Sequence, residues 1–308
     1  MNHLHRPTPL KAGNKVALIA PSGPLLHTQR LNYAMRYLNG LGLIPICGES
    51  CHVRHGYLAG RDYLRARDIN RAFGDADIKG IFCIRGGYGA ARILDRINYD
   101  AARHNPKFFC GYSDVTALHS AFNQRANLVT FHTPMLCEAS FQRADTYTLG
   151  YFNKFMFETS INGDLNNPPA RMWKFLTNGR TQGRLCGGNL TVIASLLGTP
   201  YELDTKGKII FLEDIGEEPY KIDRMLNQLQ MAGKFDDAVG IVFGDFTDCE
   251  SDDAASSLSI QEIIGGLHFK IPVLYNFACG HCTPTASLPL GTTASLDSAA
   301  NSFKIIQN

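Results

Sequence analysis

The residues best suited to chemistry surround Ser113, within the run 108–115. A short apolar stretch ends at Gly111, Ser113 follows two residues later, and a helical pattern begins at once. Such a strand-to-helix turn exposes a serine hydroxyl and directs the first backbone N–H groups of the helix at whatever the hydroxyl attacks. The run departs from the G-x-S-x-G pattern, because Val115 stands where a glycine is expected. By itself, therefore, the run is more typical of a helix N-cap formed by Ser113 or Asp114.

Two further groups of polar residues follow predicted strands. Glu213 and Asp214 come directly after the apolar run 209–212. Two carboxylates in that position carry a desolvation cost unless they cap the next helix or serve a site. His281 follows the apolar run 273–277, where a histidine is more often structural. Taken together with Ser113, a carboxylate and a histidine at strand ends supply the parts needed for nucleophilic acyl transfer.

Two other histidines compete with His281 for the role of base. His119 falls within the helix that follows Ser113, and we expect it to point away from the serine. His132 ends another predicted strand and is expected to line the pocket. A histidine can take and return a proton near neutral pH, so the residues alone leave this choice open.

A glycine-rich turn at residues 85–89, called the glycine turn below, follows the predicted strand 80–84. Glycines at a strand-to-helix turn let backbone N–H groups approach an anion closely. The turn lacks the G-x-G-x-x-G pattern and the lysine of a P-loop, which makes nucleotide binding a weak interpretation. An oxyanion hole, a carboxylate clamp or a plain tight turn would use the same geometry. Arg85 suits a substrate carboxylate, and Tyr88 is expected as a further substrate contact beside it.

These residues require a scaffold that brings strand ends together. In the first half of the chain, predicted strands alternate with predicted helices. The strands are expected at 15–20, 43–47, 80–84 and 107–110, and the helices at 27–40, 61–73 and 90–96. This alternation predicts an α/β fold whose open, mostly parallel sheet is flanked by helices and binds ligands at the carboxyl ends of its strands.

The composition changes between residues 161 and 184, where prolines and polar residues dominate. We interpret this segment as a linker between an N-terminal domain at 1–160, which carries the nucleophile, and a C-terminal domain at 185–308, which carries the acid and the base. The C-terminal domain is expected to have strands at 208–212, 238–243 and 272–277, and helices at 220–231 and 260–266.

Composition excludes several classes of protein. The chain has 308 residues, of which 44% are hydrophobic, and a formal net charge of +2. No long basic run interleaves with aromatic residues, so no nucleic-acid partner is expected. The apolar stretches are strand-sized, which argues against a membrane partner, and the first seven residues lack the apolar region of a signal peptide. Nine scattered cysteines without zinc-site spacing indicate a reduced, cytoplasmic protein with no metal and no cofactor.

Four blocks of the sequence resemble the signature blocks of the LD-carboxypeptidases, the serine peptidases that trim murein peptides. They lie at residues 85–89, 111–116, 212–226 and 280–281, in matching order and spacing over nearly the whole chain. The resemblance implies a Ser-Glu-His triad of Ser113, Glu213 and His281. It also implies an oxyanion hole formed by the backbone amides of Gly86 or Gly87 and of Asp114.

The same resemblance implies a fold, an activity and an assembly. The fold would be a Rossmann- or flavodoxin-like N-terminal domain followed by a smaller, β-rich α/β C-terminal domain, and the assembly a homodimer. The activity would be that of a muramoyltetrapeptide carboxypeptidase. Such an enzyme cleaves between an L-centre, meso-diaminopimelate or lysine, and the terminal D-alanine of murein tetrapeptide during peptidoglycan recycling.

Two alternatives remain from the sequence. The family also contains self-immunity peptidases that cleave aminoacyl-nucleotide antibiotics related to microcin C, and these carry a longer insertion with an aromatic residue that stacks on the base. The present chain is compact and its single tryptophan, Trp173, falls in the predicted linker, which favours the murein substrate. From another class, a non-catalytic small-ligand or nucleotide-binding protein would use the glycine turn.

Overall fold

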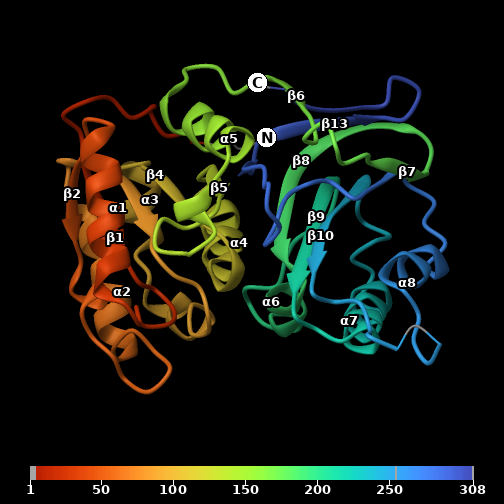
Figure 1. Ribbon diagram of the computed structural model, residues 1–308, viewed down its shortest axis with the longest axis horizontal. Coiled ribbons are helices and arrows are strands. Elements are labelled where there is room, and N and C mark those ends of the chain that lie inside the picture. The colour runs from red at the N-terminus through yellow and green to blue at the C-terminus, as the bar shows by residue number, and fades with distance from the viewer. Residues whose placement is uncertain (1–4, 254, 307–308) are drawn as a thin grey trace. The chain divides into compact units, whose positions relative to one another are not determined.

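The computed structural model describes residues 5–253 and 255–306. The chain forms two units: the first extends to Thr159 and includes Ser287–Gly291, and the second comprises Ser160–Ala286 and the residues from Thr292 onward. Each unit contains one sheet with its own helices (Figure 1). The first seven residues, in which no signal peptide is expected, lie partly outside the described residues.

The first unit is built on a six-stranded sheet with the order β12-β5-β4-β3-β1-β2. Its strands are β1 (Lys15–Ile19), β2 (Ile44–Cys47), β3 (Ile78–Cys83), β4 (Phe108–Gly111), β5 (Thr130–His132) and β12 (Leu288–Leu290). Strands β1 to β5 are parallel to their neighbours, and β12 runs antiparallel to β5. The predicted open, mostly parallel sheet is therefore confirmed.

Helices flank this sheet as the alternating pattern predicted (Figure 1). They are α1 (Thr28–Gly40), α2 (Asp62–Gly74), α3 (Tyr99–His104), α4 (Thr116–Arg125) and α5 (Thr146–Phe157). The helix predicted at 90–96 is a 3₁₀ helix, Ala91–Arg96. Strand residues such as Val16, Leu18, Ile81 and Phe109 are fully buried, as expected for a parallel sheet covered on both faces.

The second unit contains a mixed eight-stranded sheet with the order β6-β14-β13-β8-β9-β10-β11-β7. Its strands are β6 (Gly163–Leu165), β7 (Lys174–Thr177), β8 (Arg180–Asn189), β9 (Lys208–Ile215), β10 (Gly240–Thr247), β11 (Val273–Tyr275), β13 (Thr293–Asp297) and β14 (Ser302–Ile306). Its helices are α6 (Leu190–Ser195), α7 (Pro219–Met231) and α8 (Ile260–Gly266). Strands β8 to β11 are parallel, and an apolar cluster joins them to the helices.

The segment 161–184, predicted as a linker, instead forms β6, β7 and the first half of β8. Strands β6 and β7 are the two edges of the second sheet. Edge strands tolerate polar residues and nearby prolines, because one side of the strand needs no ladder partner. A composition that resembles a linker is therefore compatible with an edge strand.

A second correction concerns the predicted C-terminal domain at 185–308. Residues Ser287–Gly291 belong to the first unit, where Leu288 of β12 pairs with His132 of β5. A three-residue strand carries no periodicity, and its partner is remote in the sequence, so no local pattern predicts this pairing.

Candidate active site

The predicted strand-to-helix turn is present at Ser113. Strand β4 ends at Gly111, and a 3₁₀ turn over Ser113–Val115 continues directly into α4. Ser113 has a φ of 60°, an uncommon conformation for a residue other than glycine and one that persists only where the surroundings enforce it. Neither the 3₁₀ turn nor α4 has a side-chain N-cap hydrogen bond, so Ser113 does not serve as a helix cap. The half-buried serine therefore lies on a constrained turn of the kind that presents nucleophiles.

The glycine turn packs directly against this serine. A Cβ added at Gly86 would lie 2.9 Å from both Cβ and Oγ of Ser113. The backbone N–H of Gly23 donates to the carbonyl of Gly86 over 2.8 Å, which holds the turn from its other side. Among the described residues, no backbone–backbone hydrogen bond uses the N–H of Gly86, Gly87 or Asp114. These are the amides predicted to form an oxyanion hole.

The Asp114 side chain ties the glycine turn to the serine turn. Its Oδ2 accepts a hydrogen bond from the backbone N–H of Ala90 over 2.8 Å. Burial raises the pKa of Asp114, whereas this hydrogen bond lowers it. The carboxylate thus braces the turn and does not cap a helix.

A second brace was not predicted from the sequence. Arg65 of α2 is fully buried, and its guanidinium donates to the carbonyl groups of Pro21 and Gly89 while pairing with Asp62. A Cβ at Gly89 would lie 2.8 Å from this guanidinium, so glycine is needed there. Arg65 therefore connects the loop after β1 with the glycine turn after β3.

The two predicted substrate contacts on the glycine turn are accessible to different extents. Arg85 is half-buried, and Tyr88 is 51% exposed. The ring of Tyr88 packs edge-on against the exposed ring of Tyr57, with 5.7 Å between their centroids. This places a second aromatic ring beside the turn, one that the sequence pattern did not identify.

The sequence suggested that His119 points away from the serine turn, but the structure shows that it points toward it. Its Nε2 lies 2.9 Å from the carbonyl oxygen of Gly111. A carbonyl only accepts, so Nε2 carries the proton and donates to Gly111. Burial lowers the pKa of His119 to about 4, which keeps the ring neutral. His119 is therefore committed to supporting the backbone beside Ser113.

The burial of neutral His119 makes the free energy of unfolding depend on pH. The pKa of His119 is about 4 in the folded protein and about 6.5 in the unfolded chain. Between these values the unfolded state binds more protons, so stability is lost as the pH falls from about 6.5 to about 4, by about 3 kcal/mol. We expect urea unfolding at pH 7 and pH 4.5 to show this loss in the wild type and a smaller loss in His119→Gln. An equal loss in both proteins would contradict the assignment.

His132 is also buried, with only 1% of its surface exposed. Its ring lies edge-on to Tyr112, with 5.9 Å between centroids, and 6.4 Å from the ring of His119. The predicted role of His132 as a substrate contact or rival base is not favoured, because an interior aromatic cluster surrounds it.

The second unit brings Glu213 and His281 together. Glu213 lies inside β9, not after it, and is fully buried. Its Oε2 is 2.7 Å from Nδ1 of His281. Burial raises the pKa of Glu213, whereas the neighbouring imidazole lowers it. Because Nδ1 faces the carboxylate, Nε2 is the ring nitrogen that can exchange a proton with a nucleophile.

The loop that carries His281 is held close to this carboxylate. Gly280 has a φ of 127°, and a Cβ there would lie 2.7 Å from Oε2 of Glu213. The hydroxyl of Thr285 accepts from the N–H of Gly280 over 3.2 Å and lies 3.0 Å from its carbonyl oxygen. Only glycine fits this approach, which explains why it precedes the histidine.

The neighbouring carboxylate, Asp214, has a different task. It accepts hydrogen bonds from the Asn189 side chain, from the backbone N–H and hydroxyl of Thr191, and from the N–H of Ile215, all within 2.9 Å. Thr191 lies in the first turn of α6. Asp214 therefore stabilises a helix N-terminus, as predicted, but the helix is α6 and not the one that follows β9.

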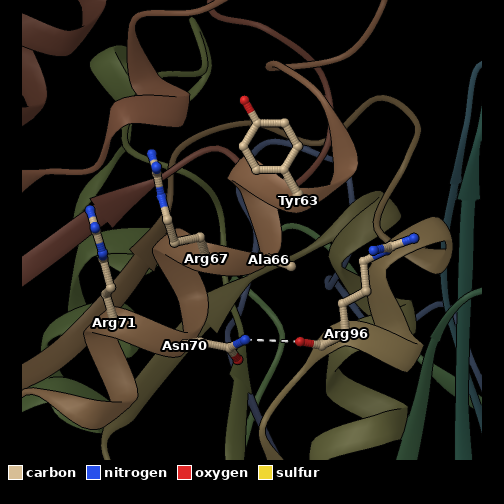
Figure 2. Close-up of a pocket in the computed structure, with 6 residues that line it drawn as sticks. All are labelled: Tyr63, Ala66, Arg67, Asn70, Arg71 and Arg96. Carbon is tan, nitrogen blue, oxygen red and sulfur yellow. Dashed lines mark hydrogen bonds between the residues drawn. The ribbon is translucent and has the colours of Figure 1, made fainter.

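The described residues contain no group of three or more histidine, cysteine, aspartate or glutamate side chains that could hold a metal ion. Nor do they contain a helix that is both long and apolar enough to cross a membrane. An open depression of about 420 Å³ on α2 is basic and includes none of the predicted site residues (Figure 2). Its lining consists of Tyr63, Ala66, Arg67, Asn70, Arg71 and Arg96.

Comparison with known proteins identifies two family models in the chain. Residues 16–133 match the LD-carboxypeptidase N-terminal domain, and residues 182–296 match the LD-carboxypeptidase C-terminal domain. The first match contains Ser113 and the glycine turn, and the second contains Glu213 and His281. Each half of the candidate site thus falls within one of the matched domains.

Individual relatives extend over nearly the whole chain. A probable murein peptide carboxypeptidase of Bacillus subtilis (strain 168) is 39% identical over 96% of this chain and 92% of its own length. The microcin C7 self-immunity protein MccF of Escherichia coli is 28% identical over 94% of this chain and 92% of its own. The crystal structure of muramoyltetrapeptide carboxypeptidase from Oxalobacter formigenes superimposes with a TM-score of 0.82 at 30% identity, covering 96% of this chain and 99% of that one.

Proposed function

The chain belongs to the LD-carboxypeptidase family, and from that premise we propose that it releases the terminal D-alanine of murein tetrapeptide during peptidoglycan recycling. It is a serine carboxypeptidase, which sets aside a non-catalytic binding protein. The proposed scissile bond joins the L-centre of meso-diaminopimelate or lysine to D-alanine. The 2.7 Å contact between Glu213 and His281 is the observation that carries this proposal, because it orients a base for a serine nucleophile.

The proposed reaction has two steps. In the first, Nε2 of His281 takes the proton of the Ser113 hydroxyl as Oγ attacks the scissile carbonyl, and then returns it to the leaving D-alanine amine. The remaining peptide is then esterified to Ser113. In the second step, His281 activates a water that hydrolyses this ester. Glu213 fixes the imidazole orientation and stabilises its positive charge in both steps.

An oxyanion hole beside Ser113 supports the same mechanism. The N–H of Asp114 and that of Gly86 or Gly87 would donate to the oxygen that becomes negative in the tetrahedral intermediate. Support comes from the close packing of Gly86 on Ser113 and from the absence of backbone partners for these amides among the described residues. Arg85 would bind the carboxylate of the terminal D-alanine, with Tyr88 contacting the substrate beside it.

Replacing Gly86 by alanine tests this part of the proposal. The new Cβ would lie 2.9 Å from Cβ and Oγ of Ser113, so the serine or the turn must shift. We expect kcat for D-alanine release to fall by about 10²- to 10³-fold, as when one oxyanion donor is lost. Gly150→Ala in α5 is the matched control, since nothing lies within 4 Å of its new methyl group. Equal kcat values for the two variants would argue against an oxyanion hole at this turn.

Substrate choice is the decisive test of the proposed function. We expect the protein to remove one D-alanine from free murein tetrapeptide and to leave pentapeptide intact, because the terminal bond of pentapeptide joins two D-residues. Mass spectrometry of both peptides after incubation, with Ser113→Ala as control, measures this. Release of D-alanine from pentapeptide at a comparable rate would refute the LD assignment.

An aminoacyl-nucleotide substrate is the alternative within the family, given the similarity to MccF. Such a substrate needs an aromatic side chain that can stack on the base. Trp173 is already engaged within the second unit: its Nε1 donates to Oδ1 of Asn301 over 3.0 Å, and its ring lies 6.0 Å from that of Phe277. These contacts argue against Trp173 as the stacking residue.

The cellular compartment, the oligomeric state and the partners of the enzyme are also part of the proposal. All nine cysteines are free thiols, which supports a reducing compartment such as the cytoplasm. We propose a homodimer, with neither nucleic acid nor membrane as partner. Gel filtration coupled to light scattering would measure the oligomeric state directly.

A further inference from the structure

The buried arginine Arg65 contacts the segments around Ser113 but has no part in the proposed reaction steps. Its side chain is fully buried, although it comes from the charged helix α2. Nη1 donates to the carbonyl oxygen of Pro21 over 2.5 Å and to that of Gly89 over 2.7 Å, and Nη2 pairs with Asp62. Burying a guanidinium is costly unless its donors find partners, so these acceptors show what Arg65 does in the fold.

The first of these carbonyl groups belongs to the loop after β1, which packs on the glycine turn. Two residues after Pro21, the N–H of Gly23 donates to the carbonyl of Gly86 over 2.8 Å. A Cβ at Gly23 would lie 2.9 Å from the same oxygen, so the loop and the turn are in direct contact. By holding Pro21, Arg65 fixes the loop that keeps Gly86 packed on Ser113.

The second carbonyl group belongs to Gly89, the last residue of the glycine turn. Gly89 has a φ of 127°, and a Cβ there would lie 2.8 Å from Nη1 of Arg65. The next residue, Ala90, donates its N–H to Oδ2 of Asp114 over 2.8 Å. Asp114 directly follows the nucleophile in the sequence. The guanidinium therefore holds one end of the glycine turn, and one further hydrogen bond connects that end to the residue beside Ser113.

The orientation of the Arg65 guanidinium is set by Asp62, one turn earlier on α2. The Asp62 carboxylate is itself held by Arg92, whose Nε and Nη2 donate to its two oxygens over 3.1 Å and 2.8 Å. Both terminal nitrogens of Arg65 are thus engaged, one by the carboxylate and one by the two carbonyl groups. A planar fork with fixed donors can hold such an arrangement, whereas the compact ammonium group of a lysine lacks this geometry.

We propose that Arg65 is a positioning residue for the chemistry at Ser113, and this role rests on the function proposed above. Arg65 acts through the carbonyl groups of Pro21 and Gly89, which set the distance between the amides of the glycine turn and the serine hydroxyl. Oxyanion donors are effective only when they already lie where the negative charge develops. Loss of the guanidinium would leave the nucleophile and the turn in place but disturb the spacing between them.

Arg65→Lys tests this role, because it keeps the positive charge and removes the fork. We expect the rate of fluorophosphonate labelling at Ser113 and kcat for D-alanine release to fall by about 10- to 100-fold, as when reacting groups are slightly misplaced. KM should change little, since Arg65 does not touch the substrate. Asp62→Asn loosens the same guanidinium from its partly exposed side, and should give the same changes to a smaller degree.

Lys107→Met is the matched control for the loss of a buried cation. Lys107 is also buried, and its ammonium group donates to the backbone carbonyls of Asp75 and Ile78. It directly precedes β4, whereas Ser113 follows the other end of that strand. We expect Lys107→Met to lower thermal stability, as Arg65→Lys does, but to leave the labelling rate and kcat close to those of the wild type. An equal loss of kcat in both variants would reduce Arg65 to a purely structural role.

A double-variant cycle tests whether Arg65 acts through the glycine turn. Gly86→Ala disturbs the same turn by direct contact with Ser113. Two changes that act on one structure are not additive in free energy, so the rate loss of the double variant should be well below the product of the two single losses. Losses that multiply would show that Arg65 acts elsewhere, and would overturn the proposed route.

Hydrogen exchange followed by mass spectrometry measures the same contacts without any chemistry at Ser113. In Arg65→Lys, the backbone amides of residues 85–90 should exchange several-fold faster than in the wild type, and in Lys107→Met they should not. Unchanged exchange at 85–90, or equal labelling rates at Ser113 in Arg65→Lys and the wild type, would overturn the positioning role. A wild type that takes no label at Ser113 would instead refute the proposed nucleophile, and with it any residue said to position it.

Discussion

Replacing either Ser113 or His281 by alanine is expected to reduce kcat for D-alanine release by about 10⁴- to 10⁶-fold. The two residues act as one unit in the proposed mechanism, because the serine hydroxyl is a poor nucleophile without its base. The double variant should therefore be no slower than either single variant. The residual rate acceleration in these variants would come from the oxyanion hole and from substrate binding.

Steady-state kinetics with murein tetrapeptide measure this loss, and two nearby variants serve as controls. Ser120→Ala removes another buried hydroxyl from α4, and His119→Gln removes the neutral histidine beside the turn. Both should keep kcat much closer to that of the wild type. The triad would be refuted if folded His281→Ala kept near-normal kcat while His132→Ala lost it.

Removal of the Glu213 charge should mainly lower kcat, whereas removal of the Asp214 charge should mainly lower the stability of the fold. Glu213→Gln keeps the size of the side chain but removes the anion that orients His281. We expect kcat to fall severely, by about one to two orders of magnitude less than in Ser113→Ala, with little change in thermal stability. The residual activity should reflect a base that is present but poorly oriented.

Asp214→Asn should affect stability more than catalysis. Its carboxylate accepts four hydrogen bonds, from Asn189, from Thr191 twice and from Ile215. An amide nitrogen cannot accept, so at least one buried donor loses its partner at a cost of about 1–3 kcal/mol. Urea unfolding and kcat, measured on both variants, give the comparison. If Asp214→Asn lost as much kcat as Glu213→Gln while remaining stable, the assigned roles would be wrong.

Much of the first unit could be predicted from the sequence because its sheet is parallel and covered by helices. Strands buried on both faces give compact apolar runs, such as Val16 to Ala20 and Ile81 to Ile84, that are separated by amphipathic helices. The edge strands β6 and β7 lack this signal, since they carry polar residues beside prolines. Strand β12 is defined only by its partner β5, more than 150 positions away.

In the candidate site, too, the sequence identifies residues whose role depends on their sequence neighbours and misses those whose partners are distant in the chain. Ser113 was identified because glycine, serine and helix follow one another along the chain. The sequence predicts that β9 ends before Glu213 and Asp214, because two adjacent carboxylates are typical of a loop. Their partners, His281 and the first turn of α6, are remote in the sequence and are known only from the structure. Arg65 was missed because an arginine in a charged helix looks like a surface residue, whereas its partners are backbone carbonyls of two separate loops.

Central to the proposed mechanism is the activation of Ser113 by the Glu213–His281 pair. Covalent labelling tests this most directly, because a fluorophosphonate reacts only with an activated serine. Ser113 lies in the tryptic peptide 108–125, which fragmentation resolves from Ser120 in the same peptide. The rate of adduct formation can thus be measured at Ser113 alone, in the wild type and in His281→Ala, Glu213→Gln and Ser120→Ala.

We predict an adduct at Ser113 in the wild type and in Ser120→Ala, and none in Ser113→Ala. The labelling rate should fall by about 10²-fold or more in His281→Ala, as expected when a general base is lost, and by less in Glu213→Gln. Murein tetrapeptide should slow labelling by competing for the site. An adduct on another residue, or equal rates at Ser113 with and without His281, would contradict the account.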